Sequence, residues 1–200
     1  MAVTAPDART RILDAAYGLF SRRGIRGVGI NAIISQSGVA RMTLYRHFAS
    51  KEALVLAYLE RREEQWTRHW LQAEVQRRAA DPRERLLAIF DVFDEWLHQT
   101  GFEGCSFINV MLETADDRDS IYRASIAYLA GIRGFLEQLA RDAAIADGEA
   151  FARKWHILMK GSIVAAGEGD RDAAKRARQM GRLLLNDEGP AVAGPSRSAV

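Results

Sequence analysis

A short break at Ser37-Gly38-Val39 separates two short helical patterns and limits the folds open to this part of the chain. Before the break, Ile33 and Ile34 occupy inward positions of one helix, and after it Leu44 and Phe48 stand four residues apart. Two helices joined by a short turn that contains Gly cross steeply, which leaves the second free to project its polar face outward. The stretch from Gly29 to Lys51 therefore predicts a helix-turn-helix.

The second helix of this motif carries polar side chains away from its apolar positions. These are Arg41, Thr43, Tyr45, Arg46 and His47, and each can hydrogen-bond to a phosphate or a base edge. Such a face suits the major groove of duplex DNA. Two alternatives stay open for single residues: an Arg can be a solvated surface charge, and Tyr45 can pack against the first helix.

The distribution of charge supports the same interpretation. Residues 1–50 hold seven Arg and two Asp, a net charge of +5, whereas residues 51–200 hold 21 basic and 24 acidic side chains, a net charge of −3. The first quarter of the chain is therefore the part predicted to meet nucleic acid.

Apolar residues recur at helical spacing along the rest of the chain, and no segment alternates between apolar and polar residues over the length of a strand. Ser50 and Asp81 are predicted N-caps, and Pro82 strengthens the second helix start. Besides the helix-turn-helix, helices are expected over about 9–23, 51–80, 82–99, 104–113, 120–144, 147–166 and 170–185.

The sequence thus predicts an all-α fold of about nine helices. We expect a three-helix DNA-binding domain over residues 9–52 and a helical ligand-binding and dimerisation domain over residues 53–185. A flexible arm over residues 1–8 and a disordered tail over residues 186–200 are expected to flank them.

The first quarter resembles the DNA-binding domain of tetracycline-repressor (TetR) family transcription regulators. The resemblance rests on the string Thr43-Leu44-Tyr45-Arg46-His47-Phe48-Ala49-Ser50-Lys51-Glu52-Ala53-Leu54, together with Ile12 to Phe20, Gly24, Ile33 and the Gly38-Val39 turn. The remainder is similar only in size, in helix count and in the Gly-Cys-x-Phe-x-Asn string from Gly104 to Asn109. The resemblance implies a cytoplasmic homodimeric repressor that binds a palindromic operator and is released by a small, largely apolar effector.

Residue roles follow from side-chain chemistry and from positions that match the family. Arg41 can contact guanine with two hydrogen bonds, worth about 1–3 kcal/mol of discrimination, and is the predicted base reader. Most of the others match family positions that contact the DNA backbone. The predicted DNA-binding residues are Asn31, Arg41, Met42, Thr43, Tyr45, Arg46, His47 and Lys51.

Three positions depart from the family pattern. Gly29 and Ala40 stand where the family often has a Ser or Thr that caps a helix, and a missing cap costs about 0.5–2 kcal/mol. Met42 stands where a small residue is usual, and its thioether can contact a thymine methyl group. The operator sequence is therefore not expected to match those of other family members.

The second part of the chain is rich in aromatic residues, which line most ligand pockets. The predicted ligand-binding residues are Trp66, Trp70, Phe90, Phe93, Trp96, Phe107, Asn109, Met111, Glu113, Tyr128, Trp155, His156 and Met159. Each aromatic has the alternative of being ordinary core, and Asn109, Glu113 and His156 are candidate polar anchors. The long helix that begins at Lys51 is the predicted lever between pocket and DNA, through Trp66 and Trp70.

The last two helices are expected to pair with those of a second copy. The predicted interface residues are Gly161, Ser162, Ala165, Ala173, Ala177, Met180 and Leu184, and Leu183 belongs to the same apolar stripe of the last helix. The alternative is that these small and apolar residues face their own core.

Catalytic, metal and membrane functions find little support in the sequence. His69, His98 and His156 have no second His or Cys three or four residues further on, so no metal or cofactor is expected. Cys105 is the only cysteine, which excludes an internal disulfide and fits a reducing cytoplasm. No secretory pattern or membrane-length apolar run is present. Two rival interpretations are a helical small-molecule-binding protein without DNA function and an enzyme dependent on Cys105 or a metal.

Overall fold

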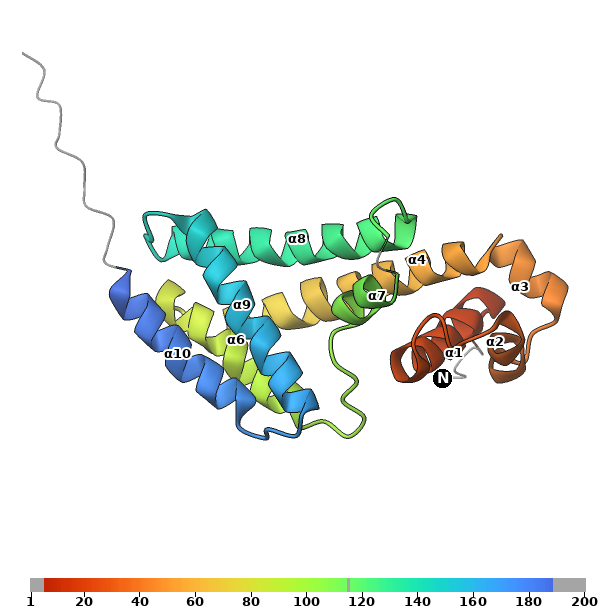
Figure 1. Ribbon diagram of the computed structural model, residues 1–200, viewed down its shortest axis with the longest axis horizontal. Coiled ribbons are helices and arrows are strands. Elements are labelled where there is room, and N and C mark those ends of the chain that lie inside the picture. The colour runs from red at the N-terminus through yellow and green to blue at the C-terminus, as the bar shows by residue number, and fades with distance from the viewer. Residues whose placement is uncertain (1–5, 115, 189–200) are drawn as a thin grey trace, which may run out of the picture. The chain divides into compact units, whose positions relative to one another are not determined.

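The computed structural model describes residues 6–114 and 116–188, and all regular elements in this part of the chain are helices (Figure 1). The predicted all-α class is confirmed. None of the helices within the described ranges is both long and apolar enough to cross a bilayer. Most of the predicted arm and tail lies outside the described residues.

The chain forms two compact units, which are described separately. The first comprises the described residues of Met1–His69 and Glu103–Ala130, and the second those of Trp70–Phe102 and Gly131–Val200. This spatial division differs from the predicted functional division at residues 52 and 53, which stays a prediction.

In the first unit, α1 is contacted by α2, α3 and α4, and α4 also meets α7. Tyr58 of α4 packs edge-on against Tyr17 and Phe20 of α1, with ring centroids 5.4 and 5.6 Å apart. These contacts tie the three N-terminal helices to the long helix that follows. The elements are α1 (Ala8–Arg23), α2 (Ile30–Ser37), α3 (Arg41–His47), α4 (Lys51–Arg62), the start of η1 (Glu63–Gln72), α7 (Ser106–Thr114) and the start of α8 (Ser120–Asp142).

In the second unit, α10 lies against both α6 and α9. The centre of this packing is aromatic, because the Trp155 ring of α9 lies 5.3 Å from Phe90 and 5.2 Å from Phe151, centroid to centroid. The unit also holds the ends of η1 and α8, and its other elements are α5 (Ala73–Arg78), α6 (Pro82–Leu97), α9 (Gly148–Gly167) and α10 (Ala173–Asp187).

The predicted N-caps are confirmed. Ser50 Oγ accepts a hydrogen bond from the Ala53 amide at 3.0 Å, and Asp81 Oδ1 accepts one from the Glu84 amide at 3.0 Å. Pro82 is the first residue of α6, where its missing amide hydrogen costs no intrahelical bond.

The expectation of one regular helix over residues 51–80 was wrong in its middle. Glu63–Gln72 is π-helical, between α4 and α5. A π-helix pairs each amide with the carbonyl five residues back, and no Gly or Pro marks the change in this stretch. The local sequence therefore contained no signal for it. When the segment from Lys51 to Arg78 is counted as one helix, the described ranges contain nine helices, as predicted.

Candidate nucleic-acid interface

The turn between α2 and α3 depends on Gly38. This residue adopts φ 65° and ψ 25°, and its amide donates to the Ile34 carbonyl at 3.0 Å. The left-handed conformation is readily available only to Gly, which closes α2 here and redirects the chain. Val39 is buried directly after the turn. The predicted helix-turn-helix is thus formed in the structure.

Burial of one side of α3 determines which side faces outward. Leu44 has no exposed surface, and Phe48, which follows the helix, is almost fully buried beneath the Arg9 guanidinium, 5.4 Å from the ring centroid. Rotating α3 would expose these side chains to water, so packing against α1 holds its orientation.

The outward side of α3 carries the predicted DNA-contacting side chains. Met42 is 79% exposed and Tyr45 is 40% exposed. Thr43 is half-buried. The remaining exposed residues of this helix are Arg41, Arg46 and His47.

Two predicted contact residues are joined before any DNA is bound. Arg41 Nη2 donates to Asn31 Oδ1 at 2.6 Å, which links the exposed sides of α3 and α2. A guanidinium has five N–H donors, so this bond leaves others available for a base. Asn31 therefore orients Arg41 in the structure, a role that the sequence did not predict.

Helix starts in this region differ in their caps. Gly29 and Ala40 make no side-chain cap to α2 or α3. Lys51, half-buried, opens the capped helix α4, where the helix dipole and free amides favour an anion such as phosphate.

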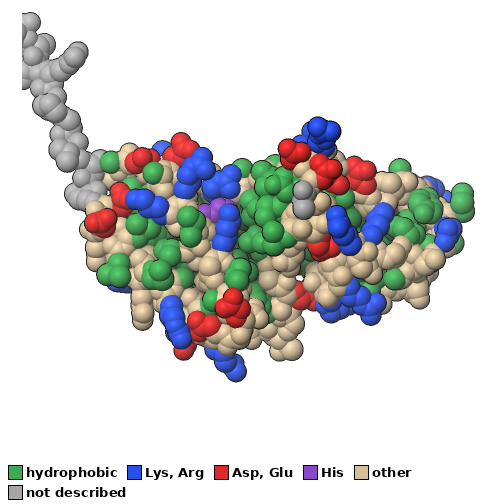
Figure 2. Space-filling view, viewed as in Figure 1, with side chains coloured by type: hydrophobic (Ala, Val, Ile, Leu, Met, Phe, Trp, Pro, Cys, Tyr) green, Lys and Arg blue, Asp and Glu red, His purple; other side chains and the backbone are tan. Residues whose placement is uncertain are grey.

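No acidic residue occurs in residues 15–51. On the face shown in Figure 2, the part formed by α2 and α3 accordingly shows Lys and Arg side chains without Asp or Glu. The potential at this end therefore favours a polyanion.

Glu113 of α7 contacts the turn between α1 and α2, although the two segments are far apart in sequence. Its Oε2 accepts the Arg26 amide at 2.9 Å, and Arg26 Nη2 donates to the Thr114 carbonyl at 3.4 Å. The carboxylate sits against Gly24, where an added Cβ would lie 2.6 Å from Oε1 and where φ is +71°. Only Gly tolerates both the close carboxylate and the positive φ at this position. Glu113 is thus engaged with the DNA-binding helices, although its predicted role was a pocket anchor.

The other predicted ligand-binding residues fall in both units. Phe107 stacks on Tyr128 in the first unit, centroids 5.1 Å apart, and the Arg62 guanidinium lies 4.8 Å from the Trp66 ring centroid. Asn109 is exposed and donates to the Glu103 carbonyl at 3.0 Å, so it lacks the burial expected of an anchor. Trp70 and Met111 are half-buried, and Phe90, Phe93, Trp96, Trp155 and Met159 are buried in the second unit.

His156 is buried in α9, and its Nδ1 has no hydrogen-bond partner in the described part of the chain. Burial, and secondarily the charges of Lys160 and Arg133, lower the pKa of His156 from 6.5 to about 3. The ring is therefore neutral at physiological pH.

The predicted interface residues do not share one exposed face. Ser162, Ala173 and Ala177 are buried within their own unit, which is the alternative noted above. Gly161 and Met180 are exposed, and Ala165 and Leu184 are half-buried. The large apolar residues exposed on α9 and α10 are Ile157 (67%), Val164 (55%), Met180 (55%) and Leu183 (70%), and of these Ile157 and Val164 were not predicted.

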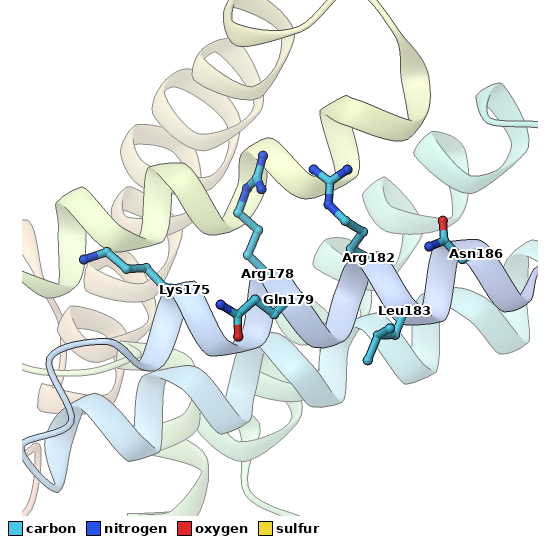
Figure 3. Close-up of a pocket in the computed structure, with 6 residues that line it drawn as sticks. All are labelled: Lys175, Arg178, Gln179, Arg182, Leu183 and Asn186. Carbon is cyan, nitrogen blue, oxygen red and sulfur yellow. The ribbon is translucent and has the colours of Figure 1, made fainter.

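A groove of about 480 Å³ runs along the outer side of α10 (Figure 3). Arg178 and Arg182 point toward α6, where they form ion pairs with Asp91 at 2.9 Å and Glu84 at 3.7 Å, respectively. Leu183 points away from them. The two arginines are thus ion-paired within the unit, whereas the Leu183 side chain is left uncovered.

Comparison with known proteins gives a family match at the N-terminal end. Residues 12–58 match the family described as bacterial regulatory proteins, tetR family. An uncharacterized HTH-type transcriptional regulator of Mycobacterium tuberculosis is 46% identical over 83 residues, 40% of this chain and 39% of the relative. The chain thus spans about two fifths of the length of the first curated relatives it matches.

Two longer matches extend the similarity. The HTH-type transcriptional repressor NemR of Escherichia coli is 25% identical over 136 residues, 68% of each chain. The crystal structure of a TetR-family transcriptional regulator from Streptomyces coelicolor superposes with a TM-score of 0.82 at 28% identity, covering 90% of this chain and 95% of that one. These relatives are described as regulators and not as enzymes, in agreement with the sequence-based expectation.

Proposed function

Because the chain belongs to the tetR family of bacterial regulatory proteins, we propose that it regulates transcription by binding duplex DNA through α3. The observation that carries this proposal is the exposed face of α3. Burial of Leu44 and Phe48 holds this face outward. Residues 15–51, which include α3, contain no acidic side chain. A helix presented in this way enters the major groove with its side chains against base edges.

Each predicted contact has a chemical role in this proposal. Arg41 reads guanine, with Asn31 as its positioning partner. Met42 contacts a thymine methyl group. Thr43, Tyr45, Arg46, His47 and Lys51 bind phosphates and set the register of the protein on the duplex.

We propose a homodimer that pairs through α9 and α10. These helices pack together and are joined by a short turn that contains Asp170. Ile157 and Leu183 are equally distant from Asp170 in sequence, so we expect them at the same height along the helix pair. With Val164 and Met180 they offer an apolar face to a second copy. A two-fold dimer presents two copies of α3 to half-sites about 34–36 Å apart, which requires a palindromic operator.

The same proposal includes release from DNA by a small effector. Repression is the proposed mode because the relative from Escherichia coli that matches 68% of each chain is described as a repressor. One helix, α7, carries both Phe107, in the stacked aromatic pair, and Glu113, bound to the Arg26 amide. A ligand that prefers one position of α7 thereby changes the position of α1 and α2. The lever through α4 with Trp66 and Trp70 stays part of the proposal.

Selection of bound fragments from random duplex DNA, followed by fluorescence anisotropy on the recovered sequence, tests the function. We expect a palindromic consensus. Arg41→Ala should weaken binding to it by about 1–3 kcal/mol and reduce the preference over random DNA. Arg171→Ala, an exposed Arg of the second unit, is the matched control and should leave binding unchanged. Absence of preference for any duplex over bulk competitor at moderate salt contradicts the proposal.

A further inference from the structure

Met42 is the most exposed large apolar side chain that the structure describes. It is the second residue of α3 and is 79% exposed, whereas Leu44, two residues further on, has no exposed surface. A side chain that lies almost entirely in water adds little to the free energy of unfolding through burial. Packing within the protein therefore does not explain a long thioether at this position.

The other described methionines are better covered. Met159 of α9 is 3% exposed, Met111 of α7 is half-buried, and Met180 of α10 is 55% exposed within the proposed dimer face. A reagent in solution reaches a thioether only where the side chain is accessible. Within residues 6–114 and 116–188, Met42 is therefore the methionine that a dissolved oxidant reaches most readily.

The surroundings of Met42 on α3 are polar. Its neighbours on the outward side carry guanidinium, hydroxyl, phenol and imidazole groups, and residues 15–51 contain no acidic side chain. Peroxides convert a thioether to a sulfoxide, and reductases reverse this change. The guanidinium and hydroxyl groups nearby do not take up oxygen from a peroxide, so such an oxidant changes the chemistry of this face at the thioether.

We propose that Met42 is a reversible oxidation site, that the oxidant is a peroxide, and that the sulfoxide weakens specific binding of α3 to DNA. The sulfur lone pair attacks one oxygen of hydrogen peroxide, and the S–O bond forms as the O–O bond breaks. The proton of the attacked oxygen passes to the leaving oxygen, which departs as water. Sulfur is oxidised by two electrons and the peroxide is reduced by two. This inference rests on the proposed function, because it adds regulation to the contact between α3 and DNA.

The sulfoxide weakens binding because it is polar where the thioether is apolar. A thymine methyl group offers no hydrogen-bond donor, so the sulfoxide oxygen loses its water in the complex without gaining a partner. In a two-fold dimer both half-sites carry this cost. The Arg, His and Lys side chains that bind phosphates are unchanged. Oxidation should therefore lower the preference for the selected duplex and leave the salt dependence of binding as it was.

Peptide mass spectrometry of the full-length protein treated with hydrogen peroxide measures the site directly. We expect sulfoxide to form at Met42 at least about tenfold faster than at the buried Met159, because access controls the rate. The selected duplex should slow the reaction at Met42 at least about tenfold, because the major groove covers α3. Met111, which lies on α7, is the internal reference and should react at the same rate with and without the duplex.

Fluorescence anisotropy on the selected duplex measures the consequence. Oxidation should weaken wild-type binding at least about tenfold, whereas Met42→Leu, which keeps a similar volume without an oxidisable sulfur, should change by less than about twofold. Met180→Leu is the matched control and should lose as much affinity on oxidation as the wild type. Methionine sulfoxide reductases, one for each epimer, should restore binding. Dithiothreitol alone should not, which separates Met42 from reversible oxidation of Cys105.

Three results overturn the inference: oxidation at Met42 no faster than at Met159, unchanged affinity when Met42 is fully converted to sulfoxide, or an equal loss of affinity in oxidised Met42→Leu and oxidised wild type. The two proposals fail in different ways. A wild type that binds no duplex before oxidation refutes the proposed function. Duplex binding that is intact before oxidation and unaffected by the sulfoxide refutes only the role of Met42.

Discussion

Among single residues, His156 gives the clearest dependence on pH. Its pKa is about 3 in the folded protein and 6.5 in the unfolded chain, so the unfolded state takes up a proton first as the pH falls. We expect the free energy of unfolding to keep its full value above pH 6.5 and to fall progressively as the pH decreases from 6.5 to about 3. The slope approaches about 1.4 kcal/mol per pH unit.

Urea unfolding at a series of pH values checks this, with His156→Leu beside the wild type. The variant should lose less stability than the wild type as the pH falls through this interval. His69→Leu, which replaces an exposed imidazole, serves as the control and should follow the wild-type curve. Parallel curves for wild type and His156→Leu would refute the assignment.

At the scale of elements, α3 lacks a capping side chain at Ala40. Ala40→Ser supplies a hydroxyl for a free amide of the first turn, and we expect it to raise the free energy of unfolding by about 0.5–2 kcal/mol. Urea denaturation gives the value. The comparison variant is Ala49→Ser, which is exposed and precedes a helix that Ser50 already caps. Equal stability changes in the two variants would contradict the cap.

The contact between α7 and the α1–α2 turn also belongs to this scale. Glu113→Ala removes the acceptor of the Arg26 amide, so hydrogen exchange at that amide should accelerate and the free energy of unfolding should fall by about 0.5–1.5 kcal/mol. Nuclear magnetic resonance measures the exchange directly. Asp117→Ala, an exposed carboxylate in the turn after α7, should change neither value. Unchanged exchange at Arg26 would show that α7 does not hold the turn in solution.

For the whole molecule, the proposed α9–α10 pairing predicts the assembly state. Leu183→Glu places two like charges in the dimer face, and we expect the dissociation constant to rise at least about a hundredfold. Sedimentation velocity should then show monomers, and affinity for the palindrome should fall with them. Leu112→Glu replaces another strongly exposed leucine, on α7, and should leave the dimer intact. A Leu183→Glu protein that remains dimeric would locate the interface elsewhere.

Local patterns predicted the elements because helix formation depends on near neighbours in sequence. Apolar spacing and the caps at Ser50 and Asp81 determined where helices begin. Gly38 determined the turn, since its left-handed conformation needs no distant partner. The α3 residues proposed to bind DNA were identified for the same reason, because Leu44 alone indicates which side of a seven-residue helix is buried.

The tertiary structure decided everything that depends on partners distant in sequence. Small residues fit either a core or an interface, and packing within the unit placed Ser162 and Ala177 inside. The contact between Glu113 and Arg26 spans 87 positions, and the π-helical backbone around Glu63 has no local marker. Sequence by itself therefore determined the helices and the DNA-facing side of α3, because these depend on neighbours in the chain. Which buried polar groups stay unpaired, and which apolar faces stay uncovered, was decided only when the helices packed.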